Sequence, residues 1–198
     1  MIYYHKFRKI LKNHEIKFDK YEVFIETGLY MGETLSDLYL NGYFKDFSKI
    51  YSIEIEKKFI ENCFNQFPFL NEEKFEIVNG DSSIELENVI QKNLNKKIVF
   101  WLDGHYSGPG TGKSENYGEC PLIQEIKMIS KLSVKPLIII DDIALFMDKT
   151  WNDENNELLR NHKRNDWPLL EQIKFEINSL PFKFEIFVDE KLSYLIAL

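Results

Sequence analysis

The chain has 198 residues, which fits one domain, and 44% of them are hydrophobic, enough for a sizeable core. Its formal net charge of −7 argues against a nucleic-acid-binding protein. The N-terminal stretch lacks the apolar run of a signal peptide, and no segment reaches the roughly 20 apolar residues of a membrane span. The two cysteines, Cys63 and Cys120, match neither a metal-binding spacing nor a disulfide framework. We therefore expect a cytoplasmic protein that has neither nucleic acid nor membrane as a partner.

Apolar runs rich in Val, Ile and Phe alternate with amphipathic stretches along the chain. After an N-terminal helical extension, predicted strands and helices alternate in this order: 1–20 (extension), 21–27 (strand), 32–44 (helix), 49–55 (strand), 56–67 (helix), 74–80 (strand), 82–93 (helix), 96–104 (strand), 120–132 (helix), 135–143 (strand) and 167–180 (helix). Two further strands follow at 182–190 and 192–198, with only a tight turn between them.

This alternation predicts a parallel sheet with right-handed crossovers and helices on both faces. The last two strands are too close together for a helical crossover, so they must pair antiparallel. The predicted fold is therefore α/β: a Rossmann-like, doubly wound, seven-stranded sheet with five parallel strands and a C-terminal antiparallel hairpin, in one domain covering residues 1–198.

Ligands of such sheets bind beyond the carboxyl ends of the strands, so the residues at those ends are the candidates for a site. The first strand ends in "ETGLYMGET", where Gly28 and Gly32 permit a tight turn and Glu26 stands at the strand end. After the second strand, Glu54 is placed to accept hydrogen bonds from two ribose hydroxyls, with Glu56 as an alternative. A plain strand–helix turn is the alternative interpretation of the glycines.

The remaining strand ends also carry polar residues. Asp81 and Ser82 follow the third strand, where either could bond an adenine amino group or cap the next helix. The densest cluster of ionisable groups follows the fourth and fifth strands in "WLDGHYSG" and "IIIDDIALF", and it contains Asp103, His105, Asp141 and Asp142. Such groups at the ends of apolar strands are costly unless they are paired, hydrated or metal-bound.

With these segments in this order, the sequence resembles the class I S-adenosylmethionine-dependent methyltransferases over residues from about 20 to 198. The C-terminal antiparallel hairpin separates this resemblance from the nicotinamide dehydrogenases, whose nucleotide-binding sheet is all parallel. The usual third glycine of the first turn is missing, because Tyr30 stands in its place. The resemblance implies that S-adenosylmethionine is bound by Glu26, Thr27, Gly28, Gly32, Thr34, Glu54, Asp81, Ser82 and Asp103.

The residues after the fourth and fifth strands also resemble those of metal-assisted O-methyltransferases that act on sugars, macrolides or catechols. That resemblance implies Asp103, Asp141 and Asp142 as ligands of Mg²⁺, which prefers oxygen ligands, although loop capping explains these carboxylates equally well. Histidine titrates near neutral pH, so His105 is the candidate general base, and Asp103 is expected beside the reacting groups.

The stretch "GPGTGKSENYGECP" is not a phosphate-binding loop, because three residues rather than four separate Gly108 from the Gly-Lys pair and no helix follows directly. We expect residues 105–119 and 144–166 to be substrate-binding or lid segments at the mouth of the sheet. Lys113 could meet an anionic group or be solvated. Arg160, His162, Lys163 and Arg164 form a basic cluster that has the same two interpretations.

The resemblance thus implies a methyltransferase acting on oxygen, with a small polar or carbohydrate acceptor, anionic or sugar-linked, from surface-glycan or natural-product biosynthesis. An N-methyltransferase, an NAD- or nucleotide-binding enzyme on a similar sheet and a catalytically silent adenosyl-binding module are the alternatives. The oligomeric state stays open, and a homodimer is one option.

Overall fold

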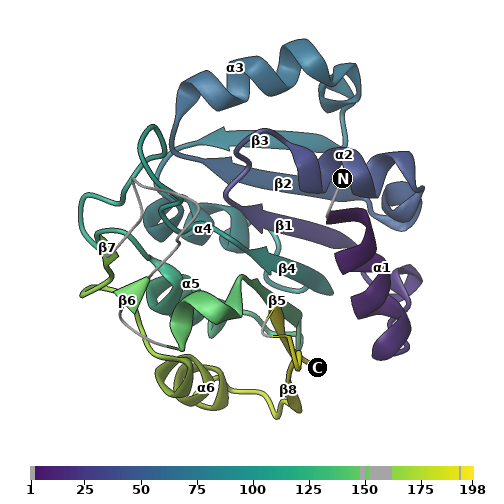
Figure 1. Cartoon of the computed structure of the whole chain (residues 1–198). Helices are drawn as coiled ribbons and strands as arrows, with labels where there is room; N and C mark the ends of the chain where they lie inside the picture. Colours follow the sequence, from purple (N-terminus) through teal and green to yellow (C-terminus); the bar gives the residue numbers. More distant parts are fainter. Residues whose placement is uncertain (1–2, 148–149, 152–161, 192) are drawn as a thin grey trace.

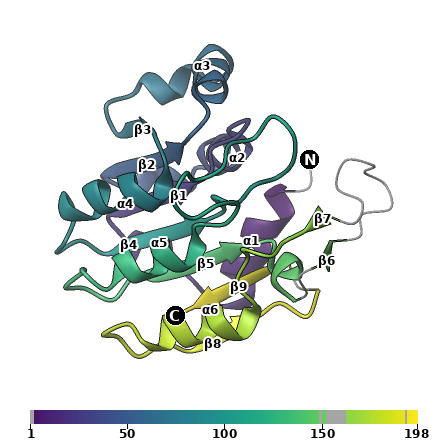
Figure 2. The same cartoon turned by 90° about the vertical axis from the view of Figure 1, so that its left-hand side faces the viewer.

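The computed structural model describes residues 3–147, 150–151, 162–191 and 193–198. Its centre is a seven-stranded sheet in the order β3-β2-β1-β4-β5-β9-β8 (Figures 1 and 2). The strands are β1 Val23–Thr27, β2 Lys49–Glu54, β3 Phe75–Asn79, β4 Ile98–Leu102, β5 Leu137–Asp141, β8 Ile186–Val188 and β9 Tyr194–Ala197. The first five run parallel, and β9 pairs antiparallel with both β5 and β8. The predicted fold class is confirmed.

The described residues form six α-helices, of which α1 precedes the first strand: α1 Tyr3–Asn13, α2 Glu33–Leu40, α3 Lys57–Gln66, α4 Ser82–Gln91, α5 Leu122–Ile129 and α6 Leu170–Asn178. Their apolar stripes form two cores, because buried residues of α1, α2 and α3 pack on one face of the sheet and those of α4, α5 and α6 on the other. Figure 2 shows α1 and α2 across the sheet from α4. In each of the strands β1, β4 and β5, all five residues are buried, as expected for strands that helices cover on both faces.

The predicted helix over residues 32–44 is shorter in the structure. It ends at Leu40, because Gly42 adopts a positive φ of 71° that a helix cannot continue through. A short 3-10 helix, η2 Tyr43–Asp46, then leads into β2.

The N-terminal extension belongs to the main core. In α1, Phe7 is buried and stacks on Trp101 of β4 with ring centroids 4.7 Å apart. Lys9 forms an ion pair of 2.6 Å with Asp189, near the C-terminal hairpin. The helix therefore ties the start of the chain to its end across one face of the sheet.

Residues 144–166 are described only in part. The segment follows β5 through η4 Ile143–Phe146 and includes the two-residue strands β6 Thr150–Trp151 and β7 His162–Lys163, which pair antiparallel. Arg160 of the predicted basic cluster lies outside the described residues. Across the described ranges, no helix has the length and apolar character that crossing a bilayer requires.

Candidate active site

A pocket of about 280 Å³ opens at the carboxyl edge of the parallel strands, the left-hand edge in Figure 1. Seven predicted site residues line it: Gly28, Glu54, Asp81, Ser82, Asp103, His105 and Asp142. Five others are not among its lining residues: Glu26, Thr27, Gly32, Thr34 and Asp141. The strand ends therefore converge on one site, as the rule for ligand binding in doubly wound parallel sheets predicts.

The turn after β1 needs its first glycine for space as well as for conformation. Gly28 has a φ of 84°, and a Cβ at this position would lie 2.4 Å from the carbonyl oxygen of Asp103. Any side chain would thus push the end of β1 away from the end of β4. The pocket floor depends on this close approach of two backbones.

Tyr30, at the position of the expected third glycine, takes the conformation that a glycine would take, with a φ of 47°. Its ring is half-exposed and packs edge-on against Phe59 at 4.8 Å. The carbonyl of Tyr30 accepts a hydrogen bond from the Cys63 thiol at 3.4 Å. The turn therefore follows a glycine-like path, and the ring contact with Phe59 is one that a glycine could not make.

Glu54 is buried at the pocket wall and fixed through both carboxylate oxygens. Oε2 accepts the Tyr30 amide and Oε1 accepts the Glu56 amide, each at 2.8 Å. Burial raises the pKa of Glu54, and the two amide hydrogen bonds act against that rise. The Glu56 carboxylate lies 3.6 Å from the Lys58 ammonium, and Glu56 does not line the pocket. Of the two carboxylates, Glu54 is therefore the one that a ligand in the pocket can reach.

Glu26 does not line the pocket. Its carboxyl is fully buried beneath the turn, where it accepts hydrogen bonds from Ser52, at 2.5 Å, and from Thr34. Burial raises the pKa of Glu26 to about 8. Glu26 and Thr34 thus hold the glycine turn from behind, and direct contact between either residue and a cofactor stays a prediction.

Asp81 caps α4 and faces the pocket with the rest of its carboxylate. Oδ1 accepts the amide and the hydroxyl of Ser83, at 2.9 and 2.6 Å. Oδ2 is buried and has no hydrogen-bond partner among the described residues. Of the two roles left open for this position, the structure shows the helix cap, and the bond to an adenine amino group stays a prediction.

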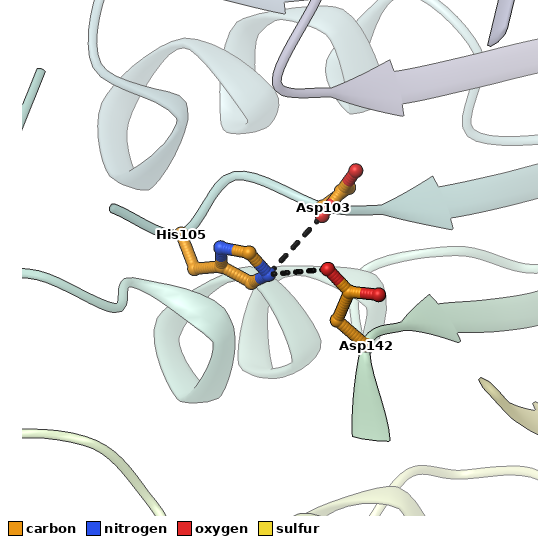
Figure 3. A group of neighbouring side chains, drawn as sticks. All are labelled: Asp103, His105 and Asp142. Carbon is orange, nitrogen blue, oxygen red and sulfur yellow. Dashed lines mark ion pairs between the residues drawn. The ribbon is translucent and has the colours of Figure 1, made fainter. Parts of the chain in front are cut away.

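Asp103, His105 and Asp142 meet at the other end of the pocket (Figure 3). The Nε2 atom of His105 lies 3.2 Å from Oδ1 of Asp103 and 3.8 Å from Oδ2 of Asp142. One ligand atom from each residue falls within 4.8 Å of the others, a spacing that suits a metal ion. The same spacing also suits an imidazole that takes up a proton beside two carboxylates.

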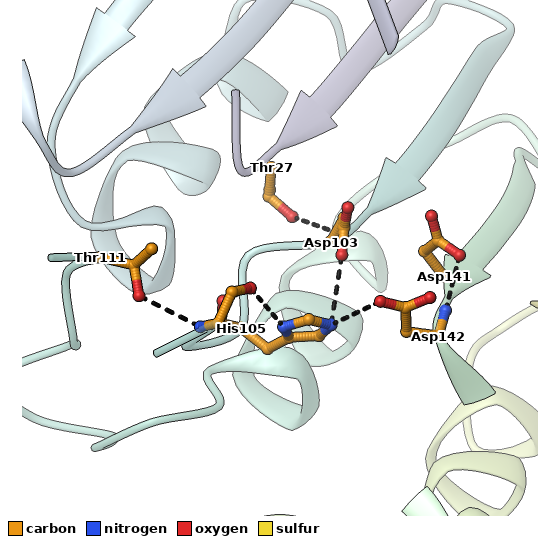
Figure 4. Close-up of polar contacts among 7 residues, drawn as sticks. Thr27, Asp103, His105, Thr111, Asp141 and Asp142 are labelled. Atoms are coloured by element: carbon orange, nitrogen blue, oxygen red, sulfur yellow. Dashed lines mark hydrogen bonds and ion pairs between the residues drawn. The ribbon is translucent and has the colours of Figure 1, made fainter. Parts of the chain in front are cut away.

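The adjacent aspartates after β5 have different surroundings (Figure 4). Asp141 is the last residue of β5 and is buried, and its Oδ1 accepts the amide of Asp142 at 2.6 Å. Asp142 has a φ of 50°, which places its half-exposed carboxylate beside His105. Asp142 is thus the member of the pair that joins Asp103 in the acidic cluster.

The segment 105–119 roofs the pocket from β4 towards the ends of β2 and α4. Gly110 accepts a hydrogen bond from Lys58 at 2.6 Å, and a Cβ on Gly112 would lie 2.1 Å from Cγ2 of Ile55. The hydroxyls of Ser114 and Ser83 lie 3.3 Å apart. Lys113 is turned away from the pocket, where it pairs with Glu119 at 2.7 Å and lies over the ring of Tyr106.

Of the predicted basic cluster, only the side chain of Arg164 is described, and it does not lie on the surface. Arg164 is buried, with its guanidinium 5.4 Å from the centre of the Trp167 ring. That ring also packs against His105, at 5.1 Å, and donates its Nε1 hydrogen to Glu119. Trp167 therefore packs against His105 without itself lining the pocket.

The sequence prediction missed Glu125. This residue of α5 is 1% exposed, and its carboxyl approaches the hydroxyls of Ser82 and Thr27, while its Oε1 has no hydrogen-bond partner among the described residues. A Cβ on Gly104 would lie 2.8 Å from its Oε1 atom. The signal was a lone carboxylate within the apolar stripe of the helix, a position where an unpartnered charge is costly.

No protein-family model matches the chain, and no curated protein matches it either. Solved structures do match in fold. A Podospora anserina methyltransferase, PaMTH1, bound to S-adenosylhomocysteine, gives a TM-score of 0.63 at 14% identity, covering 96% of this chain and 74% of that one. An O-methyltransferase from Bacillus cereus, in complex with S-adenosylhomocysteine, gives 0.59 at 14% identity, with 100% and 80% covered.

A third structure, the O-methyltransferase TomG from Streptomyces achromogenes in complex with S-adenosylmethionine, gives a TM-score of 0.55 at 11% identity, covering 91% of this chain and 74% of that one. At these identities the likeness concerns the fold, and it agrees with the strand order and the hairpin described above. The chain therefore has the fold of the class I S-adenosylmethionine-dependent methyltransferases.

Proposed function

We propose that the protein is an S-adenosylmethionine-dependent methyltransferase that methylates oxygen on a small polar acceptor. The observation that carries this proposal is the order of groups along one pocket: a glycine turn, Glu54, Asp81, and then the cluster of Asp103 and His105. In a sheet of this topology, the first three suit an adenosyl group and the last two suit the reacting atoms.

The residues fit the cofactor. The Gly28 backbone leaves no room for a side chain, so a ligand can approach it closely. Glu54 presents a fixed carboxylate to ribose hydroxyls, and Oδ2 of Asp81 is a buried acceptor without a partner in the described chain. Asp103 would meet the amino group, which is cationic. When bound, the cofactor would supply an electrophilic methyl group to the acceptor.

His105 would remove the acceptor proton. Its Nε2 faces the pocket beside Asp103 and Asp142, and both carboxylates would stabilise the imidazolium that forms. The hydroxyl of Ser107 lies 3.4 Å from Nδ1, the other ring nitrogen, and helps to orient the ring. The protein's own contribution is to hold the acceptor oxygen in line with the methyl group and to take up its proton.

Asp103, His105 and Asp142 would also hold a divalent cation such as Mg²⁺ or Mn²⁺, which would orient acceptor oxygens and lower the pKa of a hydroxyl. Asp141 fits this role less well, since one of its oxygens already accepts the Asp142 amide. The same Nε2 atom of His105 faces both carboxylates, so it cannot bind the cation and accept a proton at once. The effect of a metal chelator on turnover therefore distinguishes His105 as a general base from His105 as a ligand of the cation.

The charge of the residues that line the pocket favours some acceptors over others. Glu54, Asp81, Asp103 and Asp142 line it, and none of the described lining residues is lysine or arginine. Such a pocket repels anions, so we propose a neutral acceptor, such as a sugar hydroxyl or another polyol-like oxygen, over an anionic one. A carbohydrate acceptor from glycan or natural-product biosynthesis is consistent with this charge.

The test is a thermal-shift series with S-adenosylmethionine, S-adenosylhomocysteine, NAD and ATP, each with Mg²⁺ or with EDTA. A ligand at 100 times its Kd adds about 2.7 kcal/mol of stability, which raises the melting temperature by roughly 5–10 °C for a chain of this size. We expect the rise with the two adenosyl-sulfur ligands alone. A rise with NAD or ATP alone would overturn the proposed function.

A further inference from the structure

Glu125 lies where three elements of the site meet. It comes from α5, and its carboxyl approaches the hydroxyls of Thr27, at the end of β1, and of Ser82, at the start of α4, both of which act to lower its pKa, while its Oε1 has no hydrogen-bond partner among the described residues. Gly104, directly after β4, has no room for a side chain above it, because a Cβ there would lie 2.8 Å from the Glu125 carboxylate. One buried carboxyl thus touches the ends of two strands and one helix.

Both hydroxyls that Glu125 engages lead into the pocket. Ser82 lines the pocket itself. The amide of Asp103 is shared between the Thr27 carbonyl, at 3.1 Å, and the Thr27 Oγ1, at 3.3 Å. When Glu125 accepts the Thr27 hydroxyl hydrogen, the lone pairs of Oγ1 are left facing the Asp103 amide, so the orientation of one group fixes the other.

We propose that Glu125 is a positioning residue of the site, which sets the Ser82 hydroxyl on the adenosyl side and, through Thr27, the backbone of Asp103 on the reacting side. This inference rests on the proposed function, because it assigns the pocket to an adenosyl cofactor. A search of the residues that follow the strands does not find Glu125, because it lies on helix α5 and is not among the residues that line the pocket.

Stability alone does not account for a carboxyl at this position. Glu125 lies among apolar side chains of the core, including those of Leu122 and Ile126 on its own helix. Burial raises its pKa to about 7, and the charge of Asp81 acts in the same direction. Replacing a buried charged group by an apolar one of similar size is often neutral or stabilising. A purely structural role would therefore favour leucine or methionine.

The experiment compares the wild-type chain with Glu125→Leu and Glu125→Gln, and with Glu87→Gln as a control on the exposed face of α4, where Glu87 pairs with Lys131. The affinity for S-adenosylhomocysteine is measured by calorimetry at pH 8, and the melting temperature of the ligand-free protein is measured in the same buffer. The exchange rate of the Asp103 amide is measured by NMR without ligand.

We expect Glu125→Leu to bind S-adenosylhomocysteine roughly tenfold more weakly, with a melting temperature equal to or above that of the wild type. Glu125→Gln, which keeps the size and one oxygen acceptor, should recover part of the affinity, and Glu87→Gln should match the wild type. In both Glu125 variants the Asp103 amide should exchange faster.

Unchanged affinity in both Glu125 variants, or affinity and melting temperature that fall together, would overturn the proposal. The amide measurement keeps the two proposals separate. If the wild type binds no adenosyl ligand, the proposed function fails, and an unchanged Asp103 exchange rate in the Glu125 variants would overturn the positioning role independently.

Discussion

The amide of Tyr30 donates a 2.8 Å hydrogen bond to Oε2 of Glu54, which joins the turn after β1 to the carboxylate after β2. The other oxygen, Oε1, accepts the Glu56 amide at the same distance. Two backbone donors therefore fix the plane of one carboxylate at the pocket wall. Ribose hydroxyls that bind there meet an acceptor that is already oriented.

The first prediction concerns this carboxylate. In Glu54→Gln, the amide NH₂ group would face a backbone N–H donor, so one of the two hydrogen bonds is lost and a donor is left unpaired. We expect the affinity for S-adenosylhomocysteine to fall roughly tenfold or more by calorimetry. Glu61→Gln, on the exposed side of α3, is the matched control. Equal affinities for the two variants would remove Glu54 from the site.

The second prediction concerns the backbone of Tyr30, whose φ is 47°. A non-glycine residue in this region is strained, whereas a glycine is not, so Tyr30→Gly should be more stable than Tyr30→Ala by about 1 kcal/mol. Both variants lose the ring contact with Phe59, and their difference therefore isolates the backbone. Urea denaturation measures it. Tyr30→Ala being the more stable of the two would mean that the turn does not take this path.

The third prediction is a pH dependence caused by Glu26. Its pKa is about 8 in the folded protein and 4.5 when unperturbed, so the unfolded chain releases this proton first as the pH rises. The contribution of Glu26 therefore lowers the free energy of unfolding progressively from about pH 4.5 to about pH 8, by about 3 kcal/mol at pH 7. Glu26→Gln should remove that part of the slope.

The measurement is the free energy of unfolding in urea at pH 5, 6, 7 and 8. The difference between Glu26→Gln and the wild type should grow in favour of the variant across this series. Glu22→Gln is a suitable control, because Lys96 holds the pKa of Glu22 below its usual range and its titration ends lower. A difference that is constant with pH would show that Glu26 is ionised in the fold.

Much of this architecture could be predicted from periodicity. The five parallel strands are apolar runs, and the close spacing of the last two strands leaves only an antiparallel pairing. Because parallel strands end at one edge, seven of the site residues predicted at or after the strand ends line one pocket. These features follow from the periodicity of apolar residues and the spacing of the strands, both of which can be read directly from the sequence.

Other features depend on three-dimensional detail. Asp141 and Asp142 are neighbours in sequence, and only the positive φ of Asp142 decides which carboxylate reaches His105. Glu26 ends up behind the turn because successive residues of a strand face opposite sides of the sheet. Glu125 meets Thr27 and Ser82 only after a helix has packed on the strand ends. None of these arrangements has a signature in the order of residues.

The fourth prediction separates a general base from a metal ligand at His105. In His105→Ala, the affinity for S-adenosylhomocysteine should stay within about twofold, while turnover of an acceptor falls by roughly 10²–10⁴. If His105 acts as the base, EDTA leaves wild-type turnover unchanged. If EDTA abolishes turnover and Mg²⁺ or Mn²⁺ restores it, His105 is a ligand instead. Undiminished turnover of His105→Ala would exclude both roles.

The last prediction tests the roof over the pocket. A Cβ on Gly112 would lie 2.1 Å from Cγ2 of Ile55, so Gly112→Ala must lift the segment 105–119 from the end of β2. We expect weaker binding of S-adenosylhomocysteine and faster amide exchange in residues 107–114. Ile55 is exposed enough to truncate, and Ile55→Ala removes the clashing atom.

The double variant Gly112→Ala/Ile55→Ala should therefore recover affinity relative to Gly112→Ala, while Ile55→Ala alone stays close to the wild type. Such a recovery is the sign of two residues in contact, because the effects of distant substitutions simply add. Additive losses in the double variant would mean that the roof does not rest on Ile55. Ligand-induced protection of residues 107–114 in the wild type would then have to arise from direct contact with the cofactor.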